Sequence, residues 1–229
     1  MKLPDLKESF RKVIKFYTIK HKVYGAGSNY LYGDKYNNEN EQLIRILHKL
    51  TPIIKKYPEF FIGKSVLDFG CGTGEHTYFL SNYVDTIDCF DPQIIHYNWL
   101  NTMFKSSNII NVLKNKEYLE KHYDTIIIIG VLQCVGDYKL WLSNFIDTMH
   151  FDRLIICFSS GKVYSHINSG HSIRNTRLYD NNMNDNTVYE EEVFKGTYKL
   201  KLLDSCYEDV PSSSINPSSF KKCVHFYQR

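Results

Sequence analysis

The spacing of hydrophobic residues changes near Pro58. Before it, residues 5–22 and 40–56 carry apolar side chains at the spacing of amphipathic helices. Proline ends the second helix, and after it short apolar runs alternate with helical segments. The pattern predicts a helical extension over residues 1–58 and an α/β domain over residues 59–229.

The apolar runs of the second region have the length of β-strands. Strands are expected over residues 65–69, 86–90, 108–113, 123–129 and 153–158, then 198–203 and 222–227, with helices over 74–82, from Pro92, and over 138–149. Four consecutive isoleucines from Ile126 are typical of a strand buried on both faces. Strands that alternate with helices indicate a doubly wound α/β fold, with a mostly parallel sheet and helices on both faces.

Residues 160–192 interrupt this alternation because they are polar and rich in Asn. They contain two histidines, His166 and His171, and two arginines, Arg174 and Arg177. We expect this segment to be an insertion within the α/β domain, since the chain shows no convincing second domain.

Composition adds few constraints to this picture. The six cysteines form no C-x-x-C pair and lie mostly in apolar runs, which predicts reduced thiols and no zinc site. The N-terminus lacks the apolar core of a signal peptide, so a cytoplasmic protein without membrane contact is expected. Residues 1–60 hold twelve Lys/Arg against six Asp/Glu. That excess fits either an RNA-binding surface or the solvated faces of amphipathic helices.

A glycine-rich turn follows the first expected strand. Residues 66–74 read Val-Leu-Asp-Phe-Gly-Cys-Gly-Thr-Gly, and Asp91 ends the next strand. Ligands of doubly wound sheets bind at the carboxyl ends of the strands. A carboxylate at position 91 suits the two hydroxyls of a ribose. The spacing therefore predicts a site for an adenosine-containing ligand, although Asp68 can alternatively serve only to cap the following helix.

Two acidic residues narrow the class of ligand. A dinucleotide fingerprint needs a third glycine at position 75, where this chain has Glu75. That carboxylate, together with Asp68, would repel a pyrophosphate at the helix N-terminus. A cationic ligand without phosphate suits the site better, and S-adenosylmethionine carries a sulfonium and an ammonium group.

These residues resemble a known family. Residues 66–74 are similar to motif I of the class I S-adenosylmethionine-dependent methyltransferases, and Asp91 with Pro92 matches the family's acidic residue after the second strand. Residues 123–137 are similar to its fourth strand and following loop. The resemblance covers about residues 60–160 and implies that the chain is a methyltransferase that uses S-adenosylmethionine.

The resemblance also implies a set of cofactor contacts. Asp91 would hold the ribose, Gln93 or Ile94 would flank the adenine, and the remaining positions would lie along the methionine half. Those positions are Asp68, Gly70, Cys71, Gly72 and Gly74 in the first loop, and Gly130 and Val131 after the fourth strand. The family's acidic residue after the third strand is missing here. Asn115 or a backbone group would contact the adenine amino group instead.

The acceptor side carries weaker signals. A hydroxyl acceptor needs a base, and His166 or His171 in the polar insertion is a candidate, although both can equally be surface residues. Their spacing predicts no metal site. Tyr30 and Tyr32, in a segment with Tyr24 and Tyr36, would either fold over the site as a lid or pack the N-terminal helices onto the sheet. Arg174 and Arg177 can hold a phosphate of the substrate.

Three functions remain open at this point. Nucleic-acid amino-methyltransferases of this fold usually carry an Asn/Asp-Pro-Pro-aromatic motif where this chain has Gly130-Val-Leu-Gln133, so the sequence resembles the small-molecule branch. O-methylation of a small hydroxylated acceptor, such as a sugar or sugar nucleotide, is the preferred function. An RNA methyltransferase for a cap or tRNA is the first alternative. A non-catalytic partner subunit with the same fold is the second, and the oligomeric state is left open.

Overall fold

The structure is a computed structural model that describes residue 50 and residues 53–132, 135, 138–160, 200–209 and 221–229. These residues belong to two compact units, the first ending at Lys114 and the second beginning at Asn115. Residues 53–56 are helical, and Ile53 and Ile54 are buried. Pro58 then opens a short 3-10 helix, η3 (Pro58–Phe60), because proline suits the first turn of a helix as well as the end of one.

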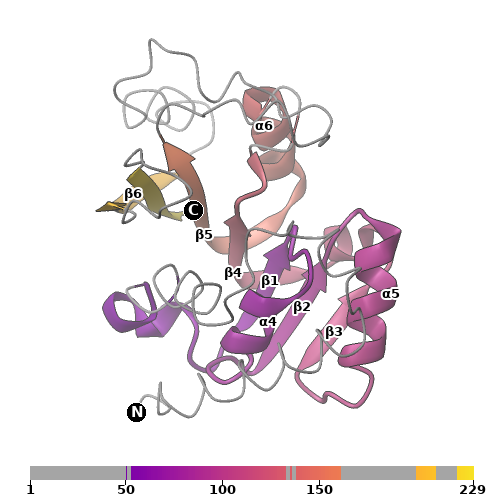
Figure 1. The fold of residues 1–229 in the computed structure, drawn as a ribbon. Helices are drawn as coiled ribbons and strands as arrows, with labels where there is room; N and C mark the ends of the chain where they lie inside the picture. The colour runs from indigo at the N-terminus through magenta and orange to yellow at the C-terminus, as the bar shows by residue number, and fades with distance from the viewer. Residues whose placement is uncertain (1–49, 51–52, 133–134, 136–137, 161–199, 210–220) are drawn as a thin grey trace, which may run out of the picture. The chain divides into compact units, whose positions relative to one another are not determined.

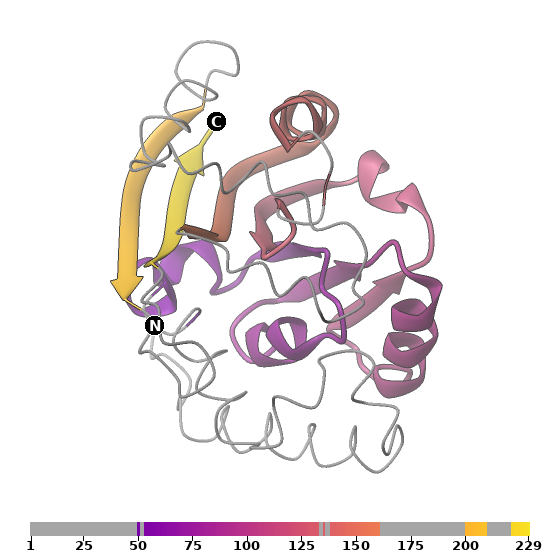
Figure 2. The ribbon, with the colours of Figure 1, turned by 45° about the horizontal axis from the view of Figure 1, so that its top comes forward.

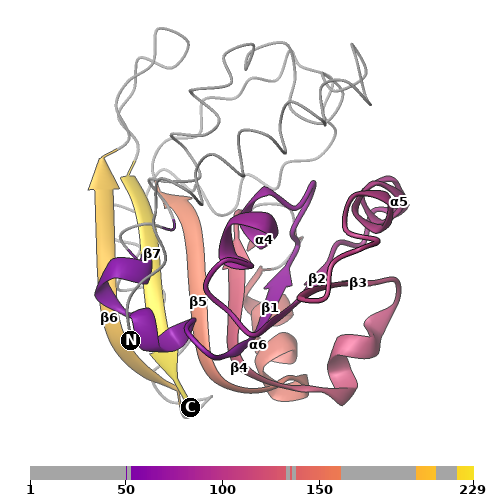
Figure 3. The same cartoon turned by 90° about the horizontal axis from the view of Figure 1, so that it is seen from below.

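The first unit contains three parallel strands in the order β3-β2-β1. Their bounds are β1 (Ser65–Phe69), β2 (Thr86–Phe90) and β3 (Ile110–Leu113), with helices α4 (Glu75–Leu80) and α5 (Ile94–Met103) between them in the sequence. Figure 3 shows α4 and α5 on the same side of these strands. This is the arrangement expected when two successive parallel crossovers have the same, right-handed sense. All three strands and both helices expected in this region are present.

Side-chain hydrogen bonds move two element boundaries from their expected positions. The helix expected from Pro92 starts at Ile94, because the Asp91 carboxylate accepts the N–H of Gln93 at 2.9 Å and forms a turn first. The strand expected from residue 108 starts at Ile110, because the Ser107 hydroxyl accepts the N–H of Ile110 at 2.9 Å. Both corrections come from short polar side chains that compete with backbone pairing.

Helix α5 packs against the loop between β1 and α4. The Trp99 indole N–H donates to the Thr73 carbonyl oxygen at 3.0 Å. Gly74, the residue before α4, has a φ of 84°, and a Cβ atom there would lie 2.5 Å from Leu100 Cδ2 and 2.9 Å from Phe104 Cε2. The close neighbours of the missing Cβ are therefore Leu100 of α5 and Phe104, the residue that follows this helix.

The second unit combines parallel and antiparallel strands in the order β4-β5-β7-β6. It contains η4 (Lys116–Glu120), β4 (His122–Ile129), α6 (Tyr138–Thr148), β5 (His150–Ser160), β6 (Lys201–Asp209) and β7 (Lys221–Gln228). Strand β4 pairs with β5 in parallel, and β7 pairs antiparallel with both β5 and β6 (Figures 1 and 2). Ile126, Ile127 and Ile128 are fully buried, as the run of isoleucines predicted.

No helix among the described residues is long and apolar enough to cross a membrane.

The contacts at Gly74 predict a stability difference between two glycine variants. Gly63 also has a left-handed φ, 66°, but the nearest atom to a Cβ there is Asp85 Oδ2 at 4.0 Å. Gly63→Ala should lower the free energy of unfolding by about 1–2 kcal/mol, the cost of left-handed backbone for alanine. Gly74→Ala should cost roughly 1–3 kcal/mol more, because its Cβ overlaps α5. Urea denaturation measures both free energies of unfolding. Equal losses in the two variants would show that α5 shifts to accommodate the added Cβ at no cost in stability.

Candidate functional site

The glycine loop, residues 70–74, joins β1 to α4 and is tied to the end of β2. The Phe90 carbonyl oxygen accepts the N–H groups of Gly70, at 2.8 Å, and Cys71, at 3.1 Å. The Gly72 N–H donates to Asp91 Oδ2 at 3.0 Å. The loop and the acidic residue after β2 are therefore one hydrogen-bonded unit at the carboxyl ends of β1 and β2, where α/β sheets bind ligands.

The Asp91 carboxylate is held by two backbone donors. Oδ2 accepts from Gly72, and Oδ1 accepts the N–H of Gln93 at 2.9 Å. The side chain is only 8% exposed, so its orientation is fixed by these contacts rather than by water. A carboxylate has about four lone-pair positions, and two backbone donors leave acceptor capacity for two hydroxyls of a ribose.

Asp68 is buried beneath the loop. Its Oδ2 accepts the Thr77 hydroxyl at 2.6 Å, and the backbone N–H of Thr77 also donates to the carboxylate. Burial, followed by the nearby charges of Asp91 and Glu75, raises the pKa of Asp68 to about 7. The alternative that Asp68 caps α4 holds in part, because Thr77 lies in the first turn of that helix.

Three carboxyl groups thus lie around the glycine loop. Glu75 is 3% exposed and accepts the hydroxyl of Thr73. Asp68 lies close enough to both Glu75 and Asp91 for their charges to interact. Like charges in a buried region raise the free energy of each other's ionised forms. A cationic group offsets this repulsion and a phosphate adds to it. The donor set therefore fits a nucleoside with a positive charge and no phosphate.

Cys71 contributes to the loop through its backbone. Its thiol is buried against Cys89, and burial raises the pKa of the Cys71 thiol well above its usual range. The thiolate form of Cys71 is therefore disfavoured. Cys71, Cys89 and Cys157 are buried free cysteines.

An exposed apolar side chain lies beside the acidic residue. Ile94, the first residue of α5, is 63% exposed and follows the turn that holds Asp91. The flat face of an adenine would cover such a side chain and remove it from water. Of the two residues expected to flank the adenine, Ile94 offers the apolar side chain, and the backbone N–H of Gln93 helps to orient Asp91.

Other predicted site residues lie in the second unit. Gly130 follows β4 with a φ of 68°, and its N–H donates to the Cys157 carbonyl oxygen at 2.8 Å. Val131 comes next and is partly buried. Asn115 precedes η4 and makes no side-chain capping hydrogen bond with it.

The acceptor-side candidates fall outside the described part of the chain. They are Tyr24, Tyr30, Tyr32, Tyr36, His166, His171, Arg174 and Arg177. Their roles stay predictions.

Two residues near the site were missed by the sequence reasoning. Trp99 holds the Thr73 carbonyl, and His96 lies with its Nδ1 atom 2.9 Å from Asp91 Oδ1. A side chain in the first turn of a helix points back towards the preceding loop. Applied to the helix after Asp91, that rule would have predicted that His96 lies near the Asp91 carboxylate.

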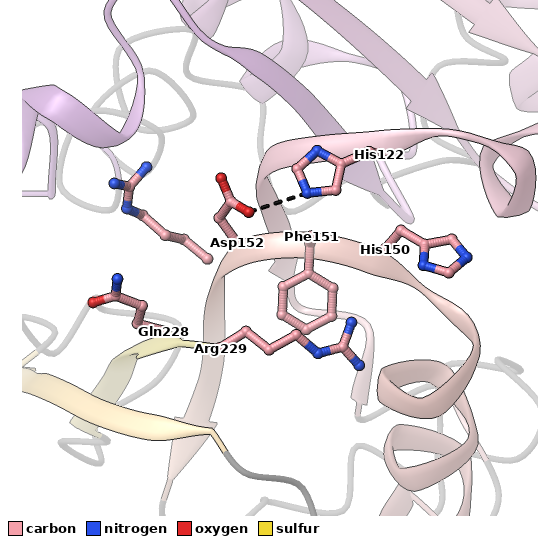
Figure 4. Close-up of a pocket in the computed structure, with 7 residues that line it drawn as sticks. His122, His150, Phe151, Asp152, Gln228 and Arg229 are labelled. Carbon is pink, nitrogen blue, oxygen red and sulfur yellow. Dashed lines mark hydrogen bonds and ion pairs between the residues drawn. The ribbon is translucent and has the colours of Figure 1, made fainter.

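A pocket of about 440 Å³ in the second unit lies elsewhere, at the starts of β4 and β5 and the end of β7 (Figure 4). Two of its polar groups are already paired. His122 contacts Asp152 at 3.0 Å, and the Arg229 guanidinium donates to the Met149 and Ile146 carbonyls at 2.8 Å. Ligands of such sheets bind at the opposite, carboxyl ends of the strands. This pocket is therefore not the cofactor site.

Comparison with known proteins agrees with the geometry of the loop. The methyltransferase domain family model matches residues 36–174, more than half of the chain. No curated protein matches the sequence.

Several solved structures share the fold at low sequence identity. The 16S rRNA methylase ArmA has a TM-score of 0.54 at 15% identity and covers 99% of each chain. The N-methyltransferase NodS from Bradyrhizobium japonicum WM9, in complex with S-adenosyl-l-homocysteine, has a TM-score of 0.53 at 13% identity and covers 86% of this chain and 89% of its own. Coclaurine N-methyltransferase, bound to N-methylheliamine and S-adenosyl-l-homocysteine, has a TM-score of 0.53 at 10% identity, with 78% and 70% covered.

The expected doubly wound α/β fold is confirmed by these neighbours. The chain belongs to the methyltransferase domain family, as an S-adenosylmethionine-dependent methyltransferase of class I.

Proposed function

We propose that this protein transfers the methyl group of S-adenosylmethionine to a hydroxyl oxygen of a small acceptor, a sugar or sugar nucleotide being the preferred class. The observation that carries the cofactor part is the Asp91 carboxylate, which two backbone N–H groups orient at the end of β2. The acceptor part is supported by the sequence Gly130-Val-Leu-Gln133, which differs from the motif of nucleic-acid amino-methyltransferases.

The residues of the first unit would divide the cofactor between them. Asp91 would accept both ribose hydroxyls, Ile94 would cover one face of the adenine, and the loop glycines would lie along the methionine half. Asp68 and Glu75 favour the positive charges of that half. The resemblance to the family also predicts Gly130 and Val131 as contacts of the methionine group, and this stays a prediction from sequence.

The chemistry needs little from the protein beyond alignment and one proton. The cofactor supplies a methyl group bound to a positively charged sulfur, which makes that carbon electrophilic. The chain must hold the acceptor oxygen in line with this carbon and exclude water, and positioning provides much of the rate. His166 or His171 would take the hydroxyl proton, and Arg174 and Arg177 would bind an acceptor phosphate.

RNA is the second candidate acceptor, on one specific observation. One solved structure of similar fold, the 16S rRNA methylase ArmA, matches with 99% coverage of both chains, and its name gives ribosomal RNA as its substrate. Residues 1–60 carry twelve Lys/Arg and six Asp/Glu, which would give that region an affinity for a phosphate backbone. A non-catalytic partner subunit is disfavoured, because the loop, Asp91 and Ile94 retain the features of a cofactor site.

Methyl-transfer assays distinguish the acceptors. With S-adenosylmethionine labelled in its methyl group, we expect label in sugar nucleotides and none in short capped RNAs or tRNA, and mass spectrometry should place the methyl group on oxygen. Asp91→Ala is the control for transfer that depends on this site. Label in RNA, with binding that weakens steeply as salt increases, would overturn the small-acceptor proposal in favour of RNA. Cofactor binding without transfer to either class would indicate the non-catalytic function.

The raised pKa of Asp68 predicts a pH dependence of stability. The pKa is about 7 in the folded chain against an ordinary value of 3.8, so the folded state binds more protons between these values. The free energy of unfolding should therefore fall as pH rises from about 4 to 7. Asp68→Asn imitates the neutral acid and should be more stable than the native chain at pH 8, by on the order of 1–4 kcal/mol, with the gap closing towards pH 4. Urea denaturation at several pH values measures it.

The same group should couple cofactor binding to proton release. A cationic cofactor favours the ionised form of Asp68, so binding below pH 7 releases a proton and becomes tighter as pH rises. Calorimetric titration with S-adenosylmethionine in two buffers of different ionisation enthalpy measures this release. Asp68→Asn should abolish it, whereas Asp88→Asn, at a buried carboxyl on β2 that pairs with Asn111, should not. Unchanged proton release in Asp68→Asn would contradict this assignment.

A further inference from the structure

His96 lies against the carboxylate that orients the proposed ribose site. It is in the first turn of α5, five residues after Asp91, and is 8% exposed. Its Nδ1 atom is 2.9 Å from Asp91 Oδ1. Among the described residues, it is the side chain that contacts this carboxylate by a polar atom, since the other two contacts come from backbone N–H groups.

The direction of this contact leaves the acceptor capacity of Asp91 intact. Nδ1 is close to Oδ1 but lies outside the direction of a well-formed hydrogen bond. The N–H groups of Gly72 and Gln93 occupy two of the four lone-pair positions of the carboxylate. Two positions therefore remain for two ribose hydroxyls. The imidazole therefore lies against the carboxylate without taking the place of the ligand.

The surroundings of Asp91 explain why such support matters. The carboxylate is 8% exposed and shares its region with Asp68 and Glu75, which are nearly fully buried. Little water reaches the carboxylate there, so its orientation depends on the protein groups that touch it. The imidazole of His96 closes one side of the carboxylate, with Nδ1 2.9 Å from Oδ1. The same contact restricts rotation of the carboxylate, which two backbone contacts alone hold less firmly.

We propose that His96 is a positioning residue for cofactor binding: it holds the Asp91 carboxylate in the orientation in which both ribose hydroxyls can be accepted. The inference rests on the proposed cofactor site and adds a determinant of its affinity. It differs from a packing role, in which His96 would contribute only to the stability of α5.

Two substitutions separate the nitrogen from the bulk of the ring. His96→Phe keeps an aromatic ring of similar size but removes the polar atom. His96→Asn is smaller, but its amide places a nitrogen donor near the position of Nδ1. In calorimetric titrations with S-adenosyl-l-homocysteine, His96→Phe should weaken binding by about five- to twentyfold, the usual effect of one lost polar contact to a charged group. His96→Asn should stay within about threefold of the native chain.

A double-mutant cycle tests whether His96 acts through Asp91. In an Asp91→Ala background, His96→Phe should change the affinity for S-adenosyl-l-homocysteine by less than about twofold, because the carboxylate that it positions is gone. Thermal unfolding of each variant without ligand checks that all of them fold. Where His96→Phe does not fold, His96→Leu takes its place in the cycle.

The outcomes are distinguishable. Equal losses from His96→Phe with and without Asp91, or equal losses from His96→Phe and His96→Asn, would overturn the positioning role and leave the cofactor site in place. An Asp91→Ala variant with native affinity would instead overturn the proposed cofactor site itself.

Discussion

The hydrogen bond from the Gly72 N–H to the Asp91 carboxylate joins the two strand ends on which the site depends. It fixes the glycine loop after β1 against the acidic residue after β2, and the Gln93 N–H holds the same carboxylate from the other side. A carboxylate fixed in this way needs no reorganisation when it meets a ribose. Helix α5 completes the arrangement, because Trp99 holds the loop while the start of the helix presents Ile94 and His96.

This arrangement has a cost in stability. Asp68 and Glu75 are almost fully buried beside Asp91, and burial raises the pKa of Asp68 to about 7. Hydrogen bonds from Thr77 and Thr73 offset part of the repulsion. A positively charged ligand would offset much of the rest. Functional sites commonly retain such unfavourable charge clusters, since the ligand that relieves them gains binding free energy by doing so.

Much of the fold was predictable because buried parallel strands are read directly from apolar runs. The isoleucines of β4 gave its position to within one residue. Strand β6 continues to Asp209, well beyond the predicted end at residue 203. The prediction stopped early because Asp204 and Glu208 interrupt the apolar pattern. Antiparallel pairing with β7 supplies its backbone hydrogen bonds whatever its side chains are, so an apolar pattern could not reveal its length.

The candidate site was predictable where local spacing decides it and not where packing does. Gly72 and Asp91 could be recognised because each follows a strand at a position set by the chain itself. The contacts of Trp99 and His96 depend on how α5 lies against the loop. The spacing of apolar and polar residues along the chain does not determine which side chains of α5 reach the loop. The residues predicted to bind the methyl acceptor, such as His171, lie outside the described part of the chain. Their roles therefore stay predictions from sequence.

The central claim is that the loop and its carboxylates select a cationic nucleoside over an anionic one. Calorimetric titration of the native chain with S-adenosylmethionine and, separately, with adenosine diphosphate tests it most directly. Both ligands carry adenosine, and they differ in the charge placed beside Asp68 and Glu75. The account predicts saturable binding of S-adenosylmethionine and no measurable binding of the diphosphate. Comparable affinity for the two ligands, or preference for the diphosphate, would contradict it.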